Sequence, residues 1–144
     1  MSYIVSCGEC GTLNKLDPQN LNHAVCGRCK HRLSAEDLRH PLVLSDSNAE
    51  KILGAESRPV LVDFWAEWCA PCRKMLPVLE QFAASQDRIA VAKIDTQSNR
   101  YFPRQFNVKA IPTLILFEQG REVKRISGAM PLKNLRRQFS PWLS

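Results

Sequence analysis

The pattern of apolar and polar positions changes between about residues 34 and 41. Residues before this point form short polar segments punctuated by glycine and cysteine, whereas those after it alternate apolar runs with helix-like repeats. Ser34 is suited to begin a helical turn, and Pro41 prevents that turn from continuing. We therefore expect a small N-terminal domain of residues 1–38, a linker of about residues 34–41 and a larger domain of residues 42–144.

Strand and helix patterns alternate in the larger domain. Apolar and β-branched residues run together in four expected strands, at residues 59–68, 89–94, 111–117 and 122–128, the last two forming a hairpin. Apolar residues at helical spacing, or a proline suited to a first turn, predict helices at residues 73–85, 98–108 and 131–143. We expect Pro77 to kink the first helix. This order predicts an α/β fold with helices on both faces of a mixed sheet.

One polar residue interrupts the first apolar run. Asp63 lies within the sequence VLVDFW, which otherwise has the pattern of a strand buried on both faces. A buried carboxylate is costly unless its pKa rises, so we expect Asp63 to accept a proton near neutral pH. Lys93, in the next apolar segment, could lie nearby and moderate this shift. An exposed position on an edge strand is the alternative for Asp63.

The six cysteines occur as three Cys-x-x-Cys pairs in a chain of 144 residues. The N-terminus lacks the basic and apolar regions of a signal peptide, and no run of eighteen apolar residues occurs. We therefore expect a cytoplasmic protein that does not bind membranes. Because thiols stay reduced there, the close pairs favour metal binding or catalysis over a permanent disulfide framework.

The net charge of +6 raises the question of nucleic-acid binding. The basic residues are scattered, however, and residues 1–40 carry five Lys or Arg against four Asp or Glu. We therefore expect a solvated, mildly basic surface that could attract acidic proteins, and we expect no nucleic-acid partner.

The first four cysteines have the spacing C-x2-C-x15-C-x2-C, which is typical of a structural zinc site. The expected ligands are Cys7, Cys10, Cys26 and Cys29. Gly8 and Gly27 follow the first cysteine of each pair and Gly11 follows Cys10, and we expect these glycines to permit tight turns. Disulfides among these cysteines, or a histidine replacing one of them, are the alternatives. Because so short a segment cannot build a sufficient apolar core, zinc is the favoured source of its stability.

The third pair, Cys69 and Cys72, lies where an expected strand ends and a helix begins. Free backbone N–H groups and the positive end of the helix dipole would favour the thiolate of Cys69. Pro71 suits the first turn of that helix. The expected role is a catalytic dithiol; an inert disulfide and an incomplete metal site are the alternatives.

These motifs resemble the thioredoxin family. The resemblance covers residues 42–143 and rests on VDFWAEWCAPCRKMLP, IPTLILFEQGREV and ISGA. With the four-cysteine segment in front, the chain resembles the zinc-containing bacterial members of the family. The resemblance implies a thioredoxin fold with an N-terminal zinc ribbon. It also implies that Cys69 attacks a protein disulfide, that Cys72 resolves the mixed disulfide and that Asp63 assists Cys72.

The resemblance implies a substrate-binding surface as well. Pro112 matches the family's cis-proline beside the dithiol, and an apolar rim is expected around it. The expected substrate-binding residues are Trp68, Pro71, Ile111, Pro112, Gly128 and Ala129. Electrons are expected from an NADPH-dependent thioredoxin reductase, because the chain has no G-x-G-x-x-G motif. We expect a monomer that binds disulfide-containing proteins.

One residue departs from the family pattern. Ala70 stands where the family usually has glycine, which bears on the redox poise of the dithiol. The alternative functions are a disulfide oxidase or isomerase of the same fold, and a zinc-ribbon module that binds protein or nucleic acid. The residues Ala70 and Pro71 between the two cysteines argue against the oxidase or isomerase, and the near-neutral ribbon argues against the binding module. Both observations favour the disulfide reductase.

Overall fold

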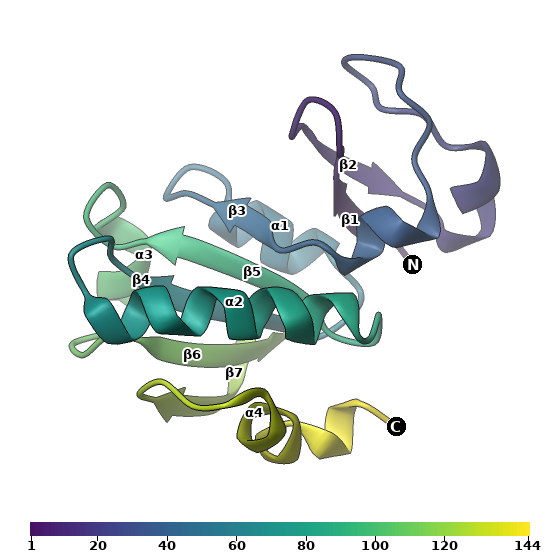
Figure 1. Ribbon diagram of the computed structural model, residues 1–144. Helices are drawn as coiled ribbons and strands as arrows, with labels where there is room; N and C mark the ends of the chain where they lie inside the picture. Colours follow the sequence, from purple (N-terminus) through teal and green to yellow (C-terminus); the bar gives the residue numbers. More distant parts are fainter.

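A five-stranded mixed sheet forms the centre of the protein in the computed structural model, which describes residues 1–144 (Figure 1). The strand order is β3-β5-β4-β6-β7. β3, β5 and β4 are parallel, and β6 and β7 run antiparallel to their neighbours. The strands are β3 (Leu42–Leu44), β4 (Val60–Trp65), β5 (Ala90–Asp95), β6 (Thr113–Glu118) and β7 (Arg121–Ser127). The predicted mixed sheet is confirmed, and β4 lies at its centre.

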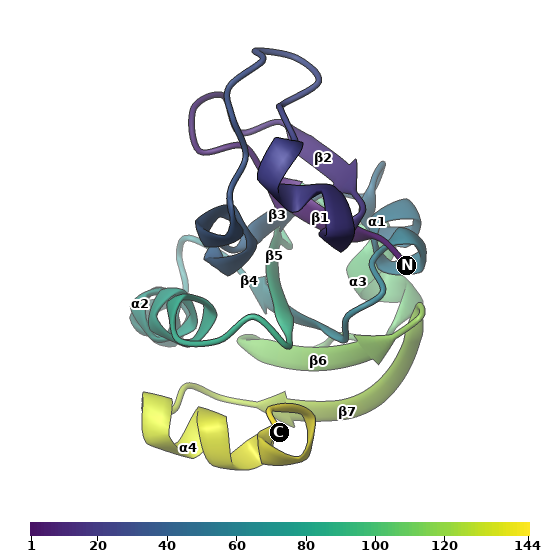
Figure 2. The same ribbon diagram turned by 90° about the vertical axis from the view of Figure 1, so that its right-hand side faces the viewer.

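Helices cover both faces of this sheet, as predicted (Figure 2). α2 and α4 lie on one side, and α1 and α3 lie on the other. Their bounds are α1 (Ala49–Ala55), α2 (Ala70–Ala84), α3 (Tyr101–Gln105) and α4 (Leu132–Gln138). α2 continues through Pro77 as one helix, and α4 ends before the short 3-10 turn Ser140–Trp142. None of these helices has the length and apolar character that crossing a membrane would require.

Alternation along β4 decides which side chains face which helices. Val60, Val62 and Phe64 belong to the core cluster that includes residues of α1 and α3. Leu61 belongs to the other cluster, which contains buried residues of α2 and α4. Because strand side chains alternate between faces, Asp63 lies on the α2 side together with Leu61. The fold therefore places this carboxylate beneath the helix that carries the cysteine pair.

The N-terminal segment forms a small unit of its own. β1 (Tyr3–Ser6) and β2 (Leu13–Leu16) pair antiparallel, and 3-10 turns follow at Pro18–His23 and Ala35–Arg39. Ser34 is the N-cap of the second turn, as predicted. The buried residues of the unit form one small cluster, made of Val5, Cys7, Cys26, Leu33 and Leu38. This cluster is consistent with the expectation that the segment cannot fold on an apolar core alone.

Residues Glu56 and Arg58, between α1 and β4, attach this unit to the sheet domain. Glu56 and Arg58 form a buried ion pair, with side chains 0% and 5% exposed. Glu56 Oε1 accepts the N–H of Ile4 at 3.1 Å, and Arg58 donates to the carbonyls of Ile4 and Leu38 at 3.4 Å. Ile4 itself packs in the core under α1. The two units therefore share buried contacts that the sequence did not predict.

Candidate active site and metal centre

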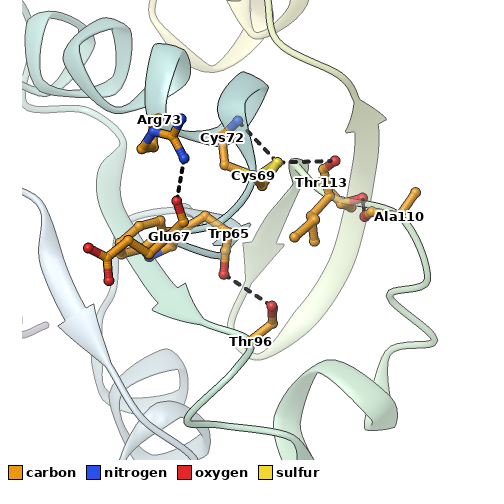
Figure 3. Close-up of a disulfide and its surroundings, with 9 residues drawn as sticks. Trp65, Glu67, Cys69, Cys72, Arg73, Thr96, Ala110 and Thr113 are labelled. Carbon is orange, nitrogen blue, oxygen red and sulfur yellow. Dashed lines mark hydrogen bonds between the residues drawn. A yellow bond between two sulfur atoms is a disulfide. The ribbon is translucent and has the colours of Figure 1, made fainter.

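The cysteine pair occupies the start of α2 (Figure 3). Cys69 is the N-cap residue, and its Sγ accepts the backbone N–H of Cys72 at 3.3 Å. The two residues form a disulfide, with Cα atoms 5.2 Å apart. Cys69 is 5% exposed and Cys72 is 0% exposed, so Cys69 is the outer sulfur. The helix terminus therefore places Cys69 closer to the surface than Cys72.

Hydrogen bonds to two backbone carbonyls fix the loop that precedes Cys69. Thr96 donates to the carbonyl of Trp65 from its N–H at 2.8 Å and from its hydroxyl at 3.1 Å. The guanidinium of Arg73 donates to the carbonyl of Glu67 (Figure 3). Trp68, which follows both anchored carbonyls and directly precedes Cys69, is 66% exposed. The loop thus holds a large apolar side chain in solvent next to the reactive sulfur, a placement that favours contact with a partner.

A second loop lies against the cysteine pair. The carbonyl oxygen of Ile111 is 3.9 Å from Cys69 Sγ, and the peptide bond between Ile111 and Pro112 is cis, as expected from the family resemblance. Gly128 donates its N–H to the carbonyl of Pro112 at 2.9 Å and has a φ of +89°, which suits glycine. Trp68 and Ile111 both line one surface groove. Gly128 is not part of that groove and is connected to the site by its hydrogen bond to Pro112. Of the remaining expected contact residues, Pro71 and Ala129 are exposed.

Asp63 is fully buried on β4. Neither of its carboxylate oxygens has a hydrogen-bond partner. Burial raises the pKa of Asp63 to about 7, and the positive charge of Lys93 partly opposes this rise. An unpartnered buried carboxylate with such a pKa can exchange a proton near neutral pH, so it is suited to act as a general base.

Lys93 is the register neighbour of Asp63 on the adjacent strand β5. It is half-buried, and its Nζ lies 5.8 Å from the centre of the Trp65 ring. It makes no ion pair with Asp63 within 4.0 Å. Lys93 therefore acts on Asp63 through its charge rather than through a hydrogen bond.

The four N-terminal cysteines converge on one point. Their Sγ atoms all lie within 4.8 Å of one another, and none forms a disulfide. The distances from Cys7 to Cys29 and from Cys10 to Cys26 are both 3.6 Å. A tetrahedral zinc ion with Zn–S bonds of about 2.3 Å needs sulfurs about 3.8 Å apart. The four sulfurs thus fit a tetrathiolate metal site, and no histidine belongs to the group.

The two Cys-x-x-Cys turns have matching geometry, and of the three glycines expected there only Gly11 has a positive φ. Gly11 donates to the Cys7 carbonyl at 2.9 Å, and Lys30 donates to the Cys26 carbonyl at 3.0 Å. The positive φ values are +74° at Gly11 and +66° at Lys30, not at the glycines inside the pairs. The left-handed residue therefore follows the second cysteine, where it turns the chain back.

Residues 40–140 match the family model described as thioredoxin. Thioredoxin C-3 of Corynebacterium nephridii is 39% identical over 128 residues, which cover 88% of this chain and 86% of that protein. The chain has too few residues after residue 39 to contain a match of 128 residues, so this match includes part of the N-terminal four-cysteine unit. The thioredoxin of Alicyclobacillus acidocaldarius subsp. acidocaldarius is 46% identical and is covered over 94% of its length by 69% of this chain.

A solved structure shows the same fold. A point-mutant thioredoxin from Halobacterium salinarum NRC-1 superposes with a TM-score of 0.67 at 31% identity, covering 74% of this chain and 93% of that chain. Together with the cysteine pair at the start of α2, these similarities show that the chain belongs to the thioredoxin family and is a protein-disulfide oxidoreductase.

Proposed function

We propose that this protein reduces disulfide bonds in other proteins and carries a structural zinc ion. In the proposed reaction, the thiolate of Cys69 attacks one sulfur of a substrate disulfide, and the other substrate sulfur leaves as a thiolate. The thiolate of Cys72 then attacks Cys69 Sγ and releases the second substrate sulfur. Two electrons pass to the substrate, and the Cys69–Cys72 disulfide remains.

The observation that carries this proposal is the unequal environment of the two sulfurs. Cys69 is the outer sulfur, and it accepts an N–H at the helix N-terminus, where a negative charge is stabilised. These features favour Cys69 as the attacking thiolate. Cys72 is completely buried and needs a base to lose its proton. Asp63 is proposed as that base because it is buried on the α2 side with a pKa of about 7. Lys93 is proposed to tune this pKa.

The proposed substrate surface surrounds Cys69. The expected contact residues are Trp68, Pro71, Ile111, Pro112, Gly128 and Ala129. Support comes from the exposure of Trp68, from the carbonyl of Ile111 near Cys69 and from the Gly128 link to Pro112. An extended substrate segment next to its disulfide would lie across these residues.

The oxidised pair must be reduced again in each cycle. We propose that an NADPH-dependent thioredoxin reductase supplies the two electrons, in a reducing compartment such as the cytoplasm. The absence of a G-x-G-x-x-G nucleotide motif from the chain favours an external electron donor. The protein is proposed to act as a monomer.

The proposed zinc site belongs to a domain of residues 1–38, followed by a thioredoxin domain of residues 42–144. Zinc bound by Cys7, Cys10, Cys26 and Cys29 would hold the two metal-binding turns together and leave no open position for catalysis. Arg58 contacts Asp87, which follows the C-terminal end of α2, whereas Cys69 lies at its other end. The length of α2, about 22 Å at 1.5 Å per residue, separates the N-terminal unit's attachment from the dithiol (Figure 1).

Insulin reduction with NADPH and thioredoxin reductase, measured alongside zinc content, tests the proposal. Cys69→Ser should abolish turnover, because it removes the attacking sulfur. Cys72→Ser should accumulate a mixed disulfide with the substrate, detectable by mass spectrometry. Turnover by Cys72→Ser at the normal rate, without an adduct, would contradict the assigned roles. A metal content far below one zinc per chain would contradict the zinc site.

A further inference from the structure

A groove lined by positively charged side chains begins beside the dithiol. It has a volume of about 520 Å³ and lies between the loop of Trp68, the residues after β5, α3 and the segment that leads to Ile111. Trp68 directly precedes Cys69, and the Ile111 carbonyl is 3.9 Å from Cys69 Sγ. One end of the groove therefore meets the sulfur that attacks a substrate. A polypeptide whose disulfide reaches Cys69 would have its neighbouring residues at the groove.

Three cations line this groove, and no carboxylate does. Arg100, Arg104 and Lys109 are all exposed. None of the three takes part in an ion pair, and none donates a side-chain hydrogen bond within the protein. Elsewhere, by contrast, Arg125 is paired with Glu122 at 2.7 Å. The groove thus presents three positive charges whose hydrogen-bond donors remain free for a partner.

Two acidic residues beside α3 and the segment before it accept hydrogen bonds from other groups. Asp46 accepts the backbone N–H groups of Tyr101 and Phe102 at the start of α3. Asp95 accepts from the N–H of Gln97 at 2.9 Å and the hydroxyl of Ser98 at 3.3 Å. In Figure 3 the carboxylate of Glu67 points away from the side of the site where Ala110 lies. None of these carboxylates forms an ion pair with the three cations, so the guanidinium and ammonium groups remain available to carboxylates of an approaching substrate.

We propose that this groove binds acidic residues next to the disulfide of a protein substrate, so that the protein preferentially reduces disulfides flanked by Asp or Glu. The proposal rests on the proposed disulfide-reducing function and names the substrate class within it. Opposite charges steer association and strengthen the encounter complex. A neutral or basic flanking segment would gain neither effect. Trp68 and Ile111 would contact the apolar part of the segment, and the cations would contact its carboxylates.

The test compares three disulfide peptides that differ only in the residues flanking the disulfide: glutamate, glutamine or lysine. Pre-reduced protein, freed of reductant, reacts with each peptide, and formation of the Cys69–Cys72 disulfide is followed by quenched-flow thiol labelling. No reductase is present, so only the first half of the cycle is measured. At low salt we expect the glutamate peptide to react roughly fivefold faster than the glutamine peptide, with two exposed charge pairs contributing. In 0.5 M NaCl the ratio should fall below about twofold, because salt screens exposed charges.

The variant R100Q/R104Q should lose most of the preference, measured within each variant as the ratio of the glutamate-peptide rate to the glutamine-peptide rate. K133Q/R137Q removes the same charge from α4 and should keep the preference. Lys109→Gln, outside any helix, provides an independent variant with a smaller loss. Equal rates for the glutamate and glutamine peptides, or an equal loss in both double variants, would overturn the groove proposal. Failure of the wild-type protein to reduce any peptide would instead overturn the proposed function.

Discussion

Replacing Asp63 with asparagine tests the assigned role of the buried carboxylate through protein stability. Its pKa is about 7 in the folded protein, against an ordinary value of 3.8. Because the folded pKa is the higher one, the folded state binds a proton that the unfolded state releases between about pH 4 and pH 7. Wild-type stability from this group is therefore present at low pH and is lost as the pH rises through that window.

The expected magnitude follows from this shift. A difference of about three pKa units corresponds to about 4 kcal/mol. Asparagine has nearly the same shape but no ionisation, so Asp63→Asn should lack this loss. Relative to wild type, the variant should gain about 4 kcal/mol in unfolding free energy between pH 4 and pH 8. The constant cost of a buried amide affects both ends of the range equally and cancels in this difference.

Urea unfolding of the oxidised protein from pH 4 to pH 9 measures the effect. Glu67→Gln serves as the matched control, because Glu67 is an exposed carboxylate close to the dithiol. Its difference from wild type should vary by less than about 1 kcal/mol over the same range. A difference for Asp63→Asn that stays constant with pH would refute the raised pKa of Asp63, because it would mean that the group has the same pKa in the folded and unfolded protein.

The same variant reports on catalysis. If Asp63 accepts the Cys72 proton, Asp63→Asn should slow insulin reduction more at pH 7 than at pH 9, because the thiol ionises without help at high pH. A loss of activity that does not depend on pH would indicate a packing role instead. Greater stability together with slower turnover would show that the protein keeps a destabilising carboxylate for its chemistry.

Three further predictions concern the N-terminal unit. Arg58→Met should lower the free energy of unfolding in urea by about 3–5 kcal/mol, because it leaves Glu56 charged and buried. Arg39→Met removes an exposed ion pair and should cost less than about 1 kcal/mol. Equal effects of the two variants would contradict the stabilising role of the buried Glu56–Arg58 pair. Chelation of the metal should unfold residues 1–38, as measured by circular dichroism, while insulin reduction continues. A loss of activity in step with the loss of zinc would contradict separate roles for the zinc site and the Cys69–Cys72 pair. Deletion of residues 1–38 should leave an active domain with a lower melting temperature, because the Ile4 packing and two Arg58 acceptors are removed; an inactive or unfolded product would contradict the domain boundary.

Local patterns were sufficient to predict the main elements of the fold. The apolar runs predicted β4, β5 and the β6–β7 hairpin, and the repeat of apolar residues predicted α2. β3 and α1 were not predicted. They have three and seven residues, so they are too short to show a clear period, and they are stabilised mainly by packing in the core. Short elements of this kind depend on partners that are distant in the sequence.

The sequence by itself determined the two kinds of cysteine pair. Four cysteines at zinc spacing and one pair at a strand–helix junction are local features, and the burial of Asp63 followed from its place in an apolar strand. These predictions succeed because neighbours within a few residues decide the local chemistry.

Only the tertiary structure decided how distant segments combine. Arg58 has the sequence context of an exposed loop residue, yet the N-terminal strand covers it and supplies the Ile4 carbonyl as an acceptor. Arg100, Arg104 and Lys109 lie within ten consecutive residues, but only the fold brings this segment to a groove with Trp68, which directly precedes Cys69. The physical reason is that burial and electrostatic potential depend on distances in space, which chain packing sets and local sequence spacing does not.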